Sequence, residues 1–387
     1  MSLRHLTAGE SHGAALVGII EGIPSGLPLD VATLHAQARR RKLGFGRGNR
    51  QTIETDEVRI VAGVRRGVTI GSPIALIIEN RDHARWAEIM RVDAPDDDAP
   101  AARAVHVPRP GHADRVGGIK YAREDLRDVL ERASARETAM RVALGTVART
   151  LLSQLGVELA SRVVRIGSAV DTTPWRNVPC EVIDASPVRA LDRDAAAAMV
   201  REIEAARDAG DALGGVFEVV ALNVPVGLGS YVQWDRRLEA EVGRAFLSLN
   251  AIKGVELGLG FGAASRLGSQ AHDPYEPGDG TRTRYRSNNA GGIEGGMSTG
   301  QPIIVRVGMK PIATLMKPLD SVDLRTGEAV KAHIERADTC AVPAAAVIGE
   351  SLLALVLAEA VLEKFGGDSL DELVERVRAW EATVRER

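Results

Sequence analysis

Aromatic residues are scarce in this sequence: Phe, Trp and Tyr together make up 3% of its 387 residues. Proteins that bind single-stranded nucleic acid stack the bases on aromatic side chains, so this composition disfavours that class. The formal net charge of −3 gives no overall preference for a polyanion either. A site for an anionic ligand must therefore come from a local cluster of charge.

Cysteine is also rare. Cys180 and Cys340 lie far apart and have no CxxC spacing, which favours two reduced, buried thiols in a cytosolic protein over a disulfide framework. The N-terminal segment MSLRHLTAGESHG lacks the apolar core of a secretory signal peptide. We therefore expect a cytoplasmic protein.

One long apolar stretch, at residues 340–367, raises the question of a membrane span. Glu350 and Glu359 interrupt it, and the Gly366-Gly367 pair at its end is typical of a helix C-cap. We expect a buried core helix here and no membrane span. With 45% apolar residues, the chain can bury a large core in one big domain or in two or three ordinary ones.

Hydrophobic patterning predicts a mixture of strands and helices. The predicted segments, in order, are a strand and Gly/Pro turn at 15–30, a helix at 31–41 capped by Asp30, a strand–turn–strand unit at 58–80, a long polar loop at 81–111, and helical regions at 123–156 and 193–210.

Two segments of the first half recur in the second half in the same order. GIPSGLP at 22–28 resembles NVPVGLG at 223–229, and AGVRRGVTIGSPI at 62–74 resembles GGIEGGMSTGQPI at 291–303. Either match alone is explained by chance similarity of Gly-rich turns. Two matches in the same order favour an internal duplication.

These patterns together predict an α/β fold of the α+β type. Because the strand–turn–strand segments favour antiparallel pairing, we expect a layered β-α-β sandwich of two antiparallel sheets with helices between them. Residues 1–387 would form a single domain, in which a pseudo-two-fold axis relates halves at roughly 1–110 and 210–330.

The segment GESHG at 9–13 matches G-x-S-x-G, the nucleophile elbow of the α/β-hydrolases. Only ten residues precede Ser11, too few for the strands that come before a true elbow. Neighbouring side chains on an extended chain point to opposite faces, so His12 is poorly placed to take a proton from Ser11. The hydrolase interpretation is rejected.

Positive charge is concentrated in ARRRKLGFGRGNR at 38–50. Its six basic residues are Arg39, Arg40, Arg41, Lys42, Arg47 and Arg50. Arginine forks match carboxylates and phosphates, and the interspersed glycines let the backbone approach a ligand. The cluster indicates either a site for a small polyanion or a solvated basic helix end favoured by the helix dipole.

PRPGHAD at 108–114 places His112 in a Pro/Gly turn beside Arg109. A histidine so placed can donate a proton to a leaving phosphate, although an exposed loop histidine is the commoner case.

ERASARETAMR at 131–141 places Arg132 and Arg136 four residues apart, on one face of a helix, with Ser134 to one side. The two arginines could equally be solvated, or paired with Glu131 and Glu137.

Residues 284–315 are rich in Gly, Asn, Ser and Thr, whose backbone N–H groups suit a phosphate or a flat ring. Lys310, just before Pro311, adds a point charge. Further along, IERADTCAVPAA places Asp338 before the apolar helix, where it is either the N-cap or a carboxylate base.

The ordered set of motifs resembles the chorismate synthase family over nearly the whole chain. The motifs are GESHG at 9–13, RRRKLGFGRGNR at 39–50, RPGHAD at 109–114, RASARET at 132–138, NAIKGVE at 250–256, SNNAGGIEGGMSTGQPI at 287–303, KPIATL at 310–315, RADTCAVPAA at 336–345 and KFGGDS at 364–369.

This resemblance implies a reaction. The family removes phosphate and a ring proton from 5-enolpyruvylshikimate 3-phosphate in a 1,4-anti elimination that gives chorismate, a step in aromatic amino acid biosynthesis by the shikimate pathway. It requires reduced FMN as a transient electron donor, although there is no net redox change. The resemblance further implies a homotetramer, and an external flavin reductase that makes NAD(P)H only an indirect source of reduced flavin. No metal ion, nucleic acid or membrane is implied.

The resemblance also implies roles for individual residues. The anion-binding arginines would be Arg41, Arg47, Arg50, Arg109 and Arg136. His112 would protonate the leaving phosphate, His12 would lie by the flavin and keep it reduced, and Asp338, through flavin N5, would assist removal of the ring proton. Ser11 and Ser134 would orient this network. The flavin contacts would be Arg132, Ala133, Ser134, Asn250, Ala251, Gly295, Lys310, Pro311, Ile312, Ala313, Thr314 and Arg336.

Two departures and two other functional classes bear on this interpretation. Ala133 stands where some relatives have serine, and alignment on LGFGR selects Arg41 over Arg40 for the substrate.

Another flavin- or phosphate-binding enzyme on the same scaffold would bind flavin without releasing phosphate from the shikimate-derived substrate. A non-catalytic anion- or nucleic-acid-binding module would show salt-sensitive polyanion binding and no flavin absorbance.

Overall fold

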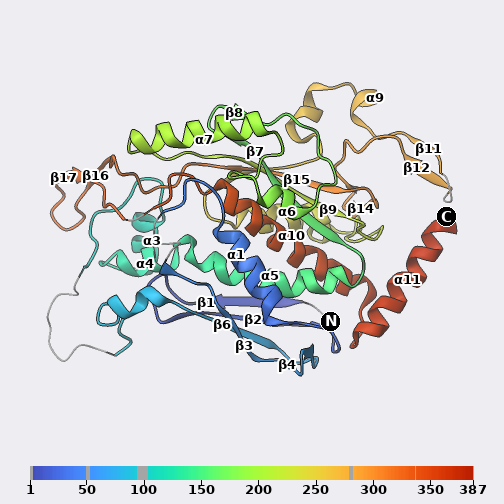
Figure 1. The fold of residues 1–387 in the computed structure, drawn as a ribbon, viewed down its shortest axis with the longest axis horizontal. Helices are drawn as coiled ribbons and strands as arrows, with labels where there is room; N and C mark the ends of the chain where they lie inside the picture. The colour runs from blue at the N-terminus through green and yellow to red at the C-terminus, as the bar shows by residue number, and fades with distance from the viewer. Residues whose placement is uncertain (1–2, 49–52, 94–102, 279–281, 336, 387) are drawn as a thin grey trace.

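A computed structural model describes residues 3–48, 53–93, 103–278, 282–335 and 337–386 (Figure 1). Two antiparallel sheets dominate it. The first has the strand order β1 (Arg4–Ala8), β2 (Ala15–Glu21), β6 (Ile74–Glu79), β3 (Val58–Ala62). The second has the order β10 (Ile252–Leu257), β15 (Ile303–Met309), β9 (Gly215–Leu222), β7 (Glu158–Ile166), β8 (Ala169–Val170).

Four two-stranded hairpins surround these sheets. They are β4 (Val64–Arg65) with β5 (Val68–Thr69), β11 (Tyr275–Pro277) with β12 (Thr283–Tyr285), β13 (Ile293–Glu294) with β14 (Met297–Ser298), and β16 (Asp320–Val322) with β17 (Ala329–Lys331).

The α-helices are α1 (Val31–Lys42), α3 (Asp114–Tyr121), α4 (Arg127–Arg132), α5 (Thr138–Ser153), α6 (Cys180–Asp184), α7 (Arg193–Asp208), α8 (Leu238–Leu247), α9 (Gly268–Ala271), α10 (Val342–Phe365) and α11 (Leu370–Glu386). Short 3-10 helices are η1 (Arg81–Arg85), η2 (Ala135–Glu137), η3 (Trp234–Arg236) and η4 (Gly260–Ser265). The prediction of a mixed α/β fold with antiparallel sheets is confirmed.

Much of the core lies where α5 and α10 meet. Helix α5 packs on β2 and β6, α10 packs on β7 and β9, and the two helices pack on each other (Figure 1). Small residues allow the close approach: a Cβ on Gly18 of β2 would lie 2.5 Å from Sδ of Met140, and one on Gly145 of α5 would lie 2.4 Å from Cβ of Ser351. Because protein interiors are close-packed, larger residues at these positions would push the layers apart.

Helix α10 is the expected core helix. Of the described helices it alone is long and apolar enough to cross a membrane, and 94% of its most apolar window is buried inside the protein. Gly366 at its C-cap has a positive φ and donates to the Leu362 carbonyl oxygen, as the Gly-Gly pair predicts. At the other end of the chain, the predicted N-cap Asp30 accepts a hydrogen bond from the Thr33 N–H at 2.7 Å.

The predicted helical region at 123–156 is not continuous. It divides into α4, η2 and α5, with Ser134 in an extended conformation at the break. The Ser134 side chain accepts a hydrogen bond from the Arg136 N–H, so a local side-chain bond competes with the helix and starts a new turn. The prediction that Arg132 and Arg136 share one helix face is therefore wrong.

Part of the predicted polar loop at 81–111 is helical. Residues 81–85 form η1, and Trp86 just after it is buried. The Trp86 indole stacks on the ring of His12, a residue of the candidate active site.

Candidate active site

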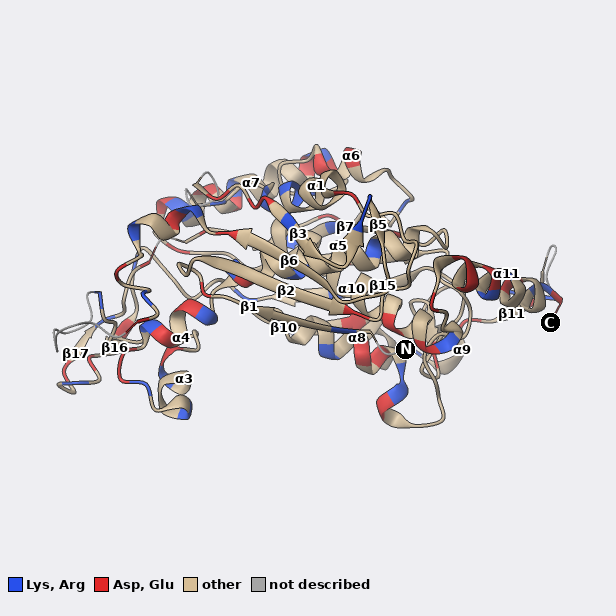
Figure 2. Cartoon of the chain, turned by 90° about the horizontal axis from the view of Figure 1, so that it is seen from below, with Lys and Arg blue, Asp and Glu red and all other residues tan. Residues whose placement is uncertain are grey.

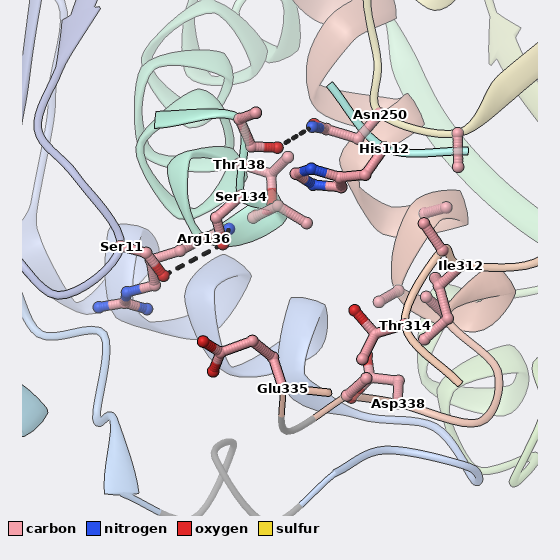
Figure 3. A pocket seen from close by; sticks show the side chains of 18 of the residues that line it. Ser11, His112, Ser134, Arg136, Thr138, Asn250, Ile312, Thr314, Glu335 and Asp338 are labelled. Carbon is pink, nitrogen blue, oxygen red and sulfur yellow. Dashed lines mark hydrogen bonds between the residues drawn. The ribbon is translucent and has the colours of Figure 1, made fainter. Parts of the chain in front are cut away.

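A cavity of about 400 Å³ collects chain segments that are far apart in the sequence (Figure 3). Sixteen of the residues singled out by sequence line it: Ser11, His12, Arg41, Arg47, Arg109, His112, Ala133, Ser134, Arg136, Asn250, Ala251, Lys310, Ile312, Ala313, Thr314 and Asp338. They come from the β1–β2 turn, the end of α1, the turn before α3, the α4–α5 break, and the segments after α8, after β15 and before α10.

Other candidates lie elsewhere. Within the described residues, Arg132, Gly295 and Pro311 do not line the cavity. Arg132 instead donates to the carbonyl oxygens of Thr7 and Gly9. Arg50 and Arg336 lie outside the described residues.

The helix break brings the two serines together. Ser11 Oγ donates to Ser134 Oγ at 3.1 Å (Figure 3), and the Ser11 N–H donates to the Glu131 carbonyl oxygen at 3.0 Å. Asn250 Nδ2 donates to the Ala133 carbonyl oxygen at 2.9 Å. A continuous helix would keep these groups within its own hydrogen bonds, so the break is what turns Ala133 and Ser134 to the cavity.

His12 is held on three sides. Its Nδ1 lies 2.9 Å from Glu131 Oε1, its backbone N–H donates to Glu131 Oε2 at 2.8 Å, and its ring stacks on Trp86 with centroids 3.9 Å apart. The guanidinium groups of Arg103 and Arg127 lie over the Trp86 ring. Such a histidine cannot be a mobile surface group, and its ring orientation is fixed before any ligand binds.

A series of polar contacts connects His12, through Glu131 and Arg127, to Glu335 in another part of the cavity lining. Arg127 Nη1 lies 3.4 Å from Glu131 and 3.1 Å from Glu335, which lines the cavity. Burial raises the pKa of Glu131, but hydrogen bonds from His12 and the charge of Arg127 outweigh it, so this pKa is lowered overall. Burial also raises the pKa of Glu335, while His333 and Arg127 lower it to about 2. Both carboxyl groups are therefore ionised at neutral pH.

Two predicted substrate arginines share one buried carboxylate. Arg41 Nη2 donates to Asp56 Oδ2 at 2.9 Å, and Arg136 Nη1 binds the other oxygen. Burial raises the pKa of Asp56, but the two guanidinium groups lower it to about 2. Arg136 also donates to Asn80 Oδ1 at 2.9 Å. Asp56 thus holds both arginines in place, with Arg41 directed to the cavity as the alignment predicts.

Because Arg40 precedes Arg41 in helix α1, its side chain points away from the cavity. It binds Glu350 and Asp184 on the opposite side of α1. Consecutive helical residues differ by about 100° in direction, so only one of the two arginines can face the ligand.

Asp338 faces the cavity and is not the N-cap of α10. Its Oδ2 lies 2.7 Å from Arg47 Nη1, and its Oδ1 accepts the Gly48 N–H at 2.7 Å. Ala341 is the N-cap residue, without a side-chain capping bond. Burial lowers the pKa of Arg47, and the charge of Asp338 opposes that shift only in part.

His112 and Arg109 converge on Asp114. Arg109 Nε donates to Asp114 Oδ2 at 2.9 Å, and His112 Nδ1 lies 2.5 Å from Asp114 Oδ1. Arg109 Nη1 also donates to Thr314 Oγ1 at 2.9 Å. This turn is therefore fixed by its own ion pairs as well as by the segment after β15.

Some polar atoms at the cavity have no protein partner. Among the described residues, Nε of Arg41, Nε of Arg47 and Oδ1 of Asn250 are buried without one. An unsatisfied buried polar group costs about 1–3 kcal/mol, so the protein alone leaves these residues of the lining incompletely hydrogen-bonded. Another part of the wall is small or apolar, with Leu130, Met309, Ile312, Ala313, Ala344, Ala345 and Ile348. A flat ring with polar edges fits such a lining, so the residues present suit a flavin.

Sequence reasoning missed two acidic residues of the lining, Glu54 and Glu335, and the groups that lie behind the lining. The latter are Asp56, Asp82, Trp86, Asp114 and Glu131. Only weak signals in the sequence point to these groups. One is a tryptophan in a polar loop, in a chain with four tryptophans, and the other is the presence of acidic residues in motifs that contain arginine or histidine.

Comparisons with known proteins show the family to which the chain belongs. A sequence model of the family described as chorismate synthase matches residues 3–362. The chain is 52% identical over 386 residues to the chorismate synthase of Moorella thermoacetica, covering 99% of this chain and 100% of that protein. It is 54% identical over 389 residues to that of Desulforudis audaxviator, covering 99% and 98%.

A crystal structure of chorismate synthase superposes with a TM-score of 0.79 at 41% identity, covering 100% of this chain and 99% of that one. At such identity over full length, both fold and family are shared. The chain therefore belongs to the chorismate synthase family of lyases.

Proposed function

We propose that the chain converts 5-enolpyruvylshikimate 3-phosphate to chorismate by 1,4-anti elimination of phosphate, and that it does so with reduced FMN. The observation that carries the proposal is the convergence of Arg41, Arg47, Arg109 and two fixed histidines on one cavity. Reduced FMN, when bound, supplies a transient electron that helps the phosphate leave.

The arginines bind the anionic groups of the substrate, which carries two carboxylates and a phosphate. Arg41 and Arg136 are held by Asp56, and Arg109 by Asp114, so each presents its remaining N–H groups in a fixed direction. Pre-organised guanidinium forks bind carboxylate and phosphate strongly because little side-chain entropy is lost on binding.

Proton transfer is divided between two sides of the site. His112 donates a proton from Nε2 to the departing phosphate, because its Nδ1 is directed to Asp114. Asp338 is the carboxylate that finally receives the ring proton, and Arg47 and the Gly48 N–H hold it in position. His12 keeps a polar ring on the cofactor side, fixed by Glu131 and Trp86.

The cofactor contacts are assigned to the segments with small side chains and exposed backbone. They are Ala133, Ser134, Asn250, Ala251 and residues 310–314, together with Arg132 and Gly295, which do not line the cavity, and Arg336, which lies outside the described residues. Support comes from the unpaired Oδ1 of Asn250 and from Lys310, whose Nζ donates to the Gly111 carbonyl oxygen at 2.6 Å.

An anaerobic assay tests the proposal against its two competitors. Purified protein is mixed with the substrate and dithionite-reduced FMN, and chorismate absorbance is followed. Chorismate formation supports the proposal. Flavin binding without phosphate release indicates another flavin enzyme, and salt-sensitive polyanion binding without flavin absorbance indicates a binding module.

We further propose a cytoplasmic homotetramer that receives reduced flavin from an external reductase. Support for assembly comes from the four-stranded sheet, whose strands carry mostly uncharged residues, drawn in tan in Figure 2. Leu6 and Ile19 lie opposite each other there and are 70% and 42% exposed. Exposed apolar sheet faces are typical of subunit interfaces. Light scattering checks the mass, and NAD(P)H-driven anaerobic turnover by the protein alone would contradict the external reductase.

We also propose that the fold is a single domain, a layered sandwich that arose by duplication. The strand orders β1-β2-β6-β3 and β7-β9-β15-β10 correspond one to one. In the first half Thr69 Oγ1 donates to the Pro24 carbonyl oxygen at 2.6 Å and accepts the Leu27 N–H at 3.0 Å.

The second half repeats these bonds. Ser298 Oγ donates to the Pro225 carbonyl oxygen at 2.6 Å and accepts the Leu228 N–H at 2.8 Å. The matching bridges Pro28–Val68 and Gly229–Met297 support the sequence alignment of 22–28 with 223–229. This correspondence extends the proposed halves to about 4–153 and 158–365, since each half is closed by a core helix, α5 or α10.

A further inference from the structure

Asp114 is a fully buried carboxylate that neither binds the substrate nor takes up a proton in the proposed chemistry. It is the first residue of α3, with no solvent exposure, and it touches the histidine assigned to protonate the phosphate. Its Oδ1 lies 2.5 Å from His112 Nδ1, and Arg109 binds it through Nε at 2.9 Å, Nη2 at 3.1 Å and the backbone N–H at 3.1 Å. Every partner of Asp114 therefore belongs to the turn that carries His112.

The contacts decide which ring nitrogen of His112 carries the proton. Arg109 Nη2 also lies 3.0 Å from His112 Nδ1, and an arginine can only donate. If Nδ1 lacked a proton, its lone pair would face the Asp114 carboxylate at 2.5 Å, which is repulsive. If Nδ1 carries the proton, it donates to Asp114, and Arg109 Nη2 is still satisfied by Asp114 Oδ1.

Asp114 is ionised, so the second arrangement is favoured. Burial raises the pKa of Asp114, but the hydrogen bonds from His112 and Arg109 outweigh it and hold this pKa well below its ordinary value. The His112 side chain is 19% exposed and lines the cavity, so the nitrogen left to interact there is Nε2.

We propose that Asp114 is the positioning residue for His112: it fixes the Nδ1–H tautomer and stabilises the imidazolium, so that Nε2 presents its proton to the leaving phosphate. In the step, the Nε2–H bond breaks and a phosphate O–H bond forms as the substrate C–O bond breaks, with the bonding electrons leaving on phosphate. This inference rests on the proposed function and assigns to it a residue outside the substrate contacts.

Asp114→Asn is the direct test because it keeps the shape of the side chain. The amide oxygen can still accept from Arg109, while the amide nitrogen donates to His112 Nδ1 and imposes the opposite tautomer. Without the carboxylate the imidazolium, which is the acidic form of His112, is no longer stabilised, and general acid catalysis by a positioned group contributes about 10²–10⁴-fold. We expect kcat to fall about 10²-fold or more, with KM changed little.

Asp128→Asn is the matched control. Arg123 and Asp128 have the same five-residue spacing as Arg109 and Asp114, but this pair is exposed and does not line the cavity. The control variant is expected to keep the wild-type kcat.

The second measurement does not depend on turnover. Histidine is labelled with ¹⁵N, the His112 signals are assigned with His112→Gln, and the tautomer is read where the ring is neutral. We expect Nδ1–H in the wild type and Nε2–H in Asp114→Asn. An Nε2–H tautomer in the wild type overturns the inference even if the variant does not fold.

The remaining outcomes are equally decisive. A fall in kcat without a change of tautomer, or unchanged kcat with a changed tautomer, also overturns the inference. Absence of chorismate formation by the wild type would instead refute the proposed function, while the tautomer measurement would still report on Asp114.

Discussion

Glu350 lies in the middle of the most apolar helix of the chain and offers a quantitative test of the fold. Its side chain is 1% exposed. Oε1 accepts from Ser161 Oγ at 2.6 Å and from Arg40 Nη2 at 3.0 Å, and Oε2 accepts from Arg40 Nη1 at 2.6 Å and from Arg149. Arg189 lies 3.4 Å away. One carboxylate thus ties α10 to α1, α5 and β7.

Glu350→Gln removes the negative charge and keeps the volume. Arg40 and Arg189 then keep Asp184 as a carboxylate partner, while Arg149 loses the carboxylate that it binds among the described residues. Breaking a buried ion pair from one side typically costs about 3–5 kcal/mol, since the partner charge stays buried without compensation. We expect a loss of that size in the free energy of unfolding, measured by urea denaturation at fixed protein concentration.

Glu359→Gln, in the same helix, is the control, because its expected effect on the free energy of unfolding is neutral or opposite in sign. Burial and the nearby Glu241 raise the pKa of Glu359, so removal of its charge should be neutral or stabilising. A loss below about 1 kcal/mol for Glu350→Gln, or equal losses for both variants, would refute the reasoning.

Glu350 and Glu359 also make the free energy of unfolding depend on pH. Burial raises the pKa of Glu350, but Arg40, Arg149 and Arg189 outweigh it, so the folded-state pKa lies below the ordinary 4.5. Its stabilisation is therefore present above pH 4.5 and is lost as the pH falls toward the folded-state value. Glu359 has a raised folded-state pKa, so its contribution is present below pH 4.5 and is lost as the pH rises through that pKa.

Three substitutions test the assigned roles in the cavity. His112→Ala should lower kcat by about 10²–10⁴-fold with little change in substrate affinity; a collapse of binding with unchanged turnover per bound substrate would contradict its role. Asp338→Asn should keep flavin binding, measured by absorbance titration, and lose most activity; a fully active variant would reduce Asp338 to a structural partner of Arg47. Arg47→Ala should raise KM by roughly 10–150-fold, as for loss of a charged hydrogen bond, and an unchanged KM would place it outside the substrate site.

The local features of this fold could be predicted from sequence because they depend on neighbouring residues. Asp30 caps α1 and Gly366 ends α10 through bonds that span a few residues. The cavity-lining residues were identified by resemblance of short motifs, and the same resemblance selected Arg41 over Arg40. Helical periodicity alone could not make that choice, because it fixes the angle between the two side chains but not which one faces the ligand.

The supporting groups could not be predicted because their partners are distant in the chain. His12 and Glu131 are 119 residues apart, and Arg136 and Asp56 are 80 apart. A lone glutamate or aspartate is normally a surface residue, so only the fold shows which ones are buried against a histidine or an arginine. The break at Ser134 was missed for a similar reason: the flanking helical spacing is strong, and a serine in such a run is usually tolerated.

The most direct test of the account is the stoichiometry of a single anaerobic reaction. Purified protein, a limiting amount of reduced FMN and an excess of 5-enolpyruvylshikimate 3-phosphate are mixed, and phosphate, chorismate and the flavin redox state are followed together. The account predicts equal amounts of phosphate and chorismate, many turnovers per flavin and no net flavin oxidation. Phosphate release without chorismate, or product that stops at one equivalent per flavin, would contradict it.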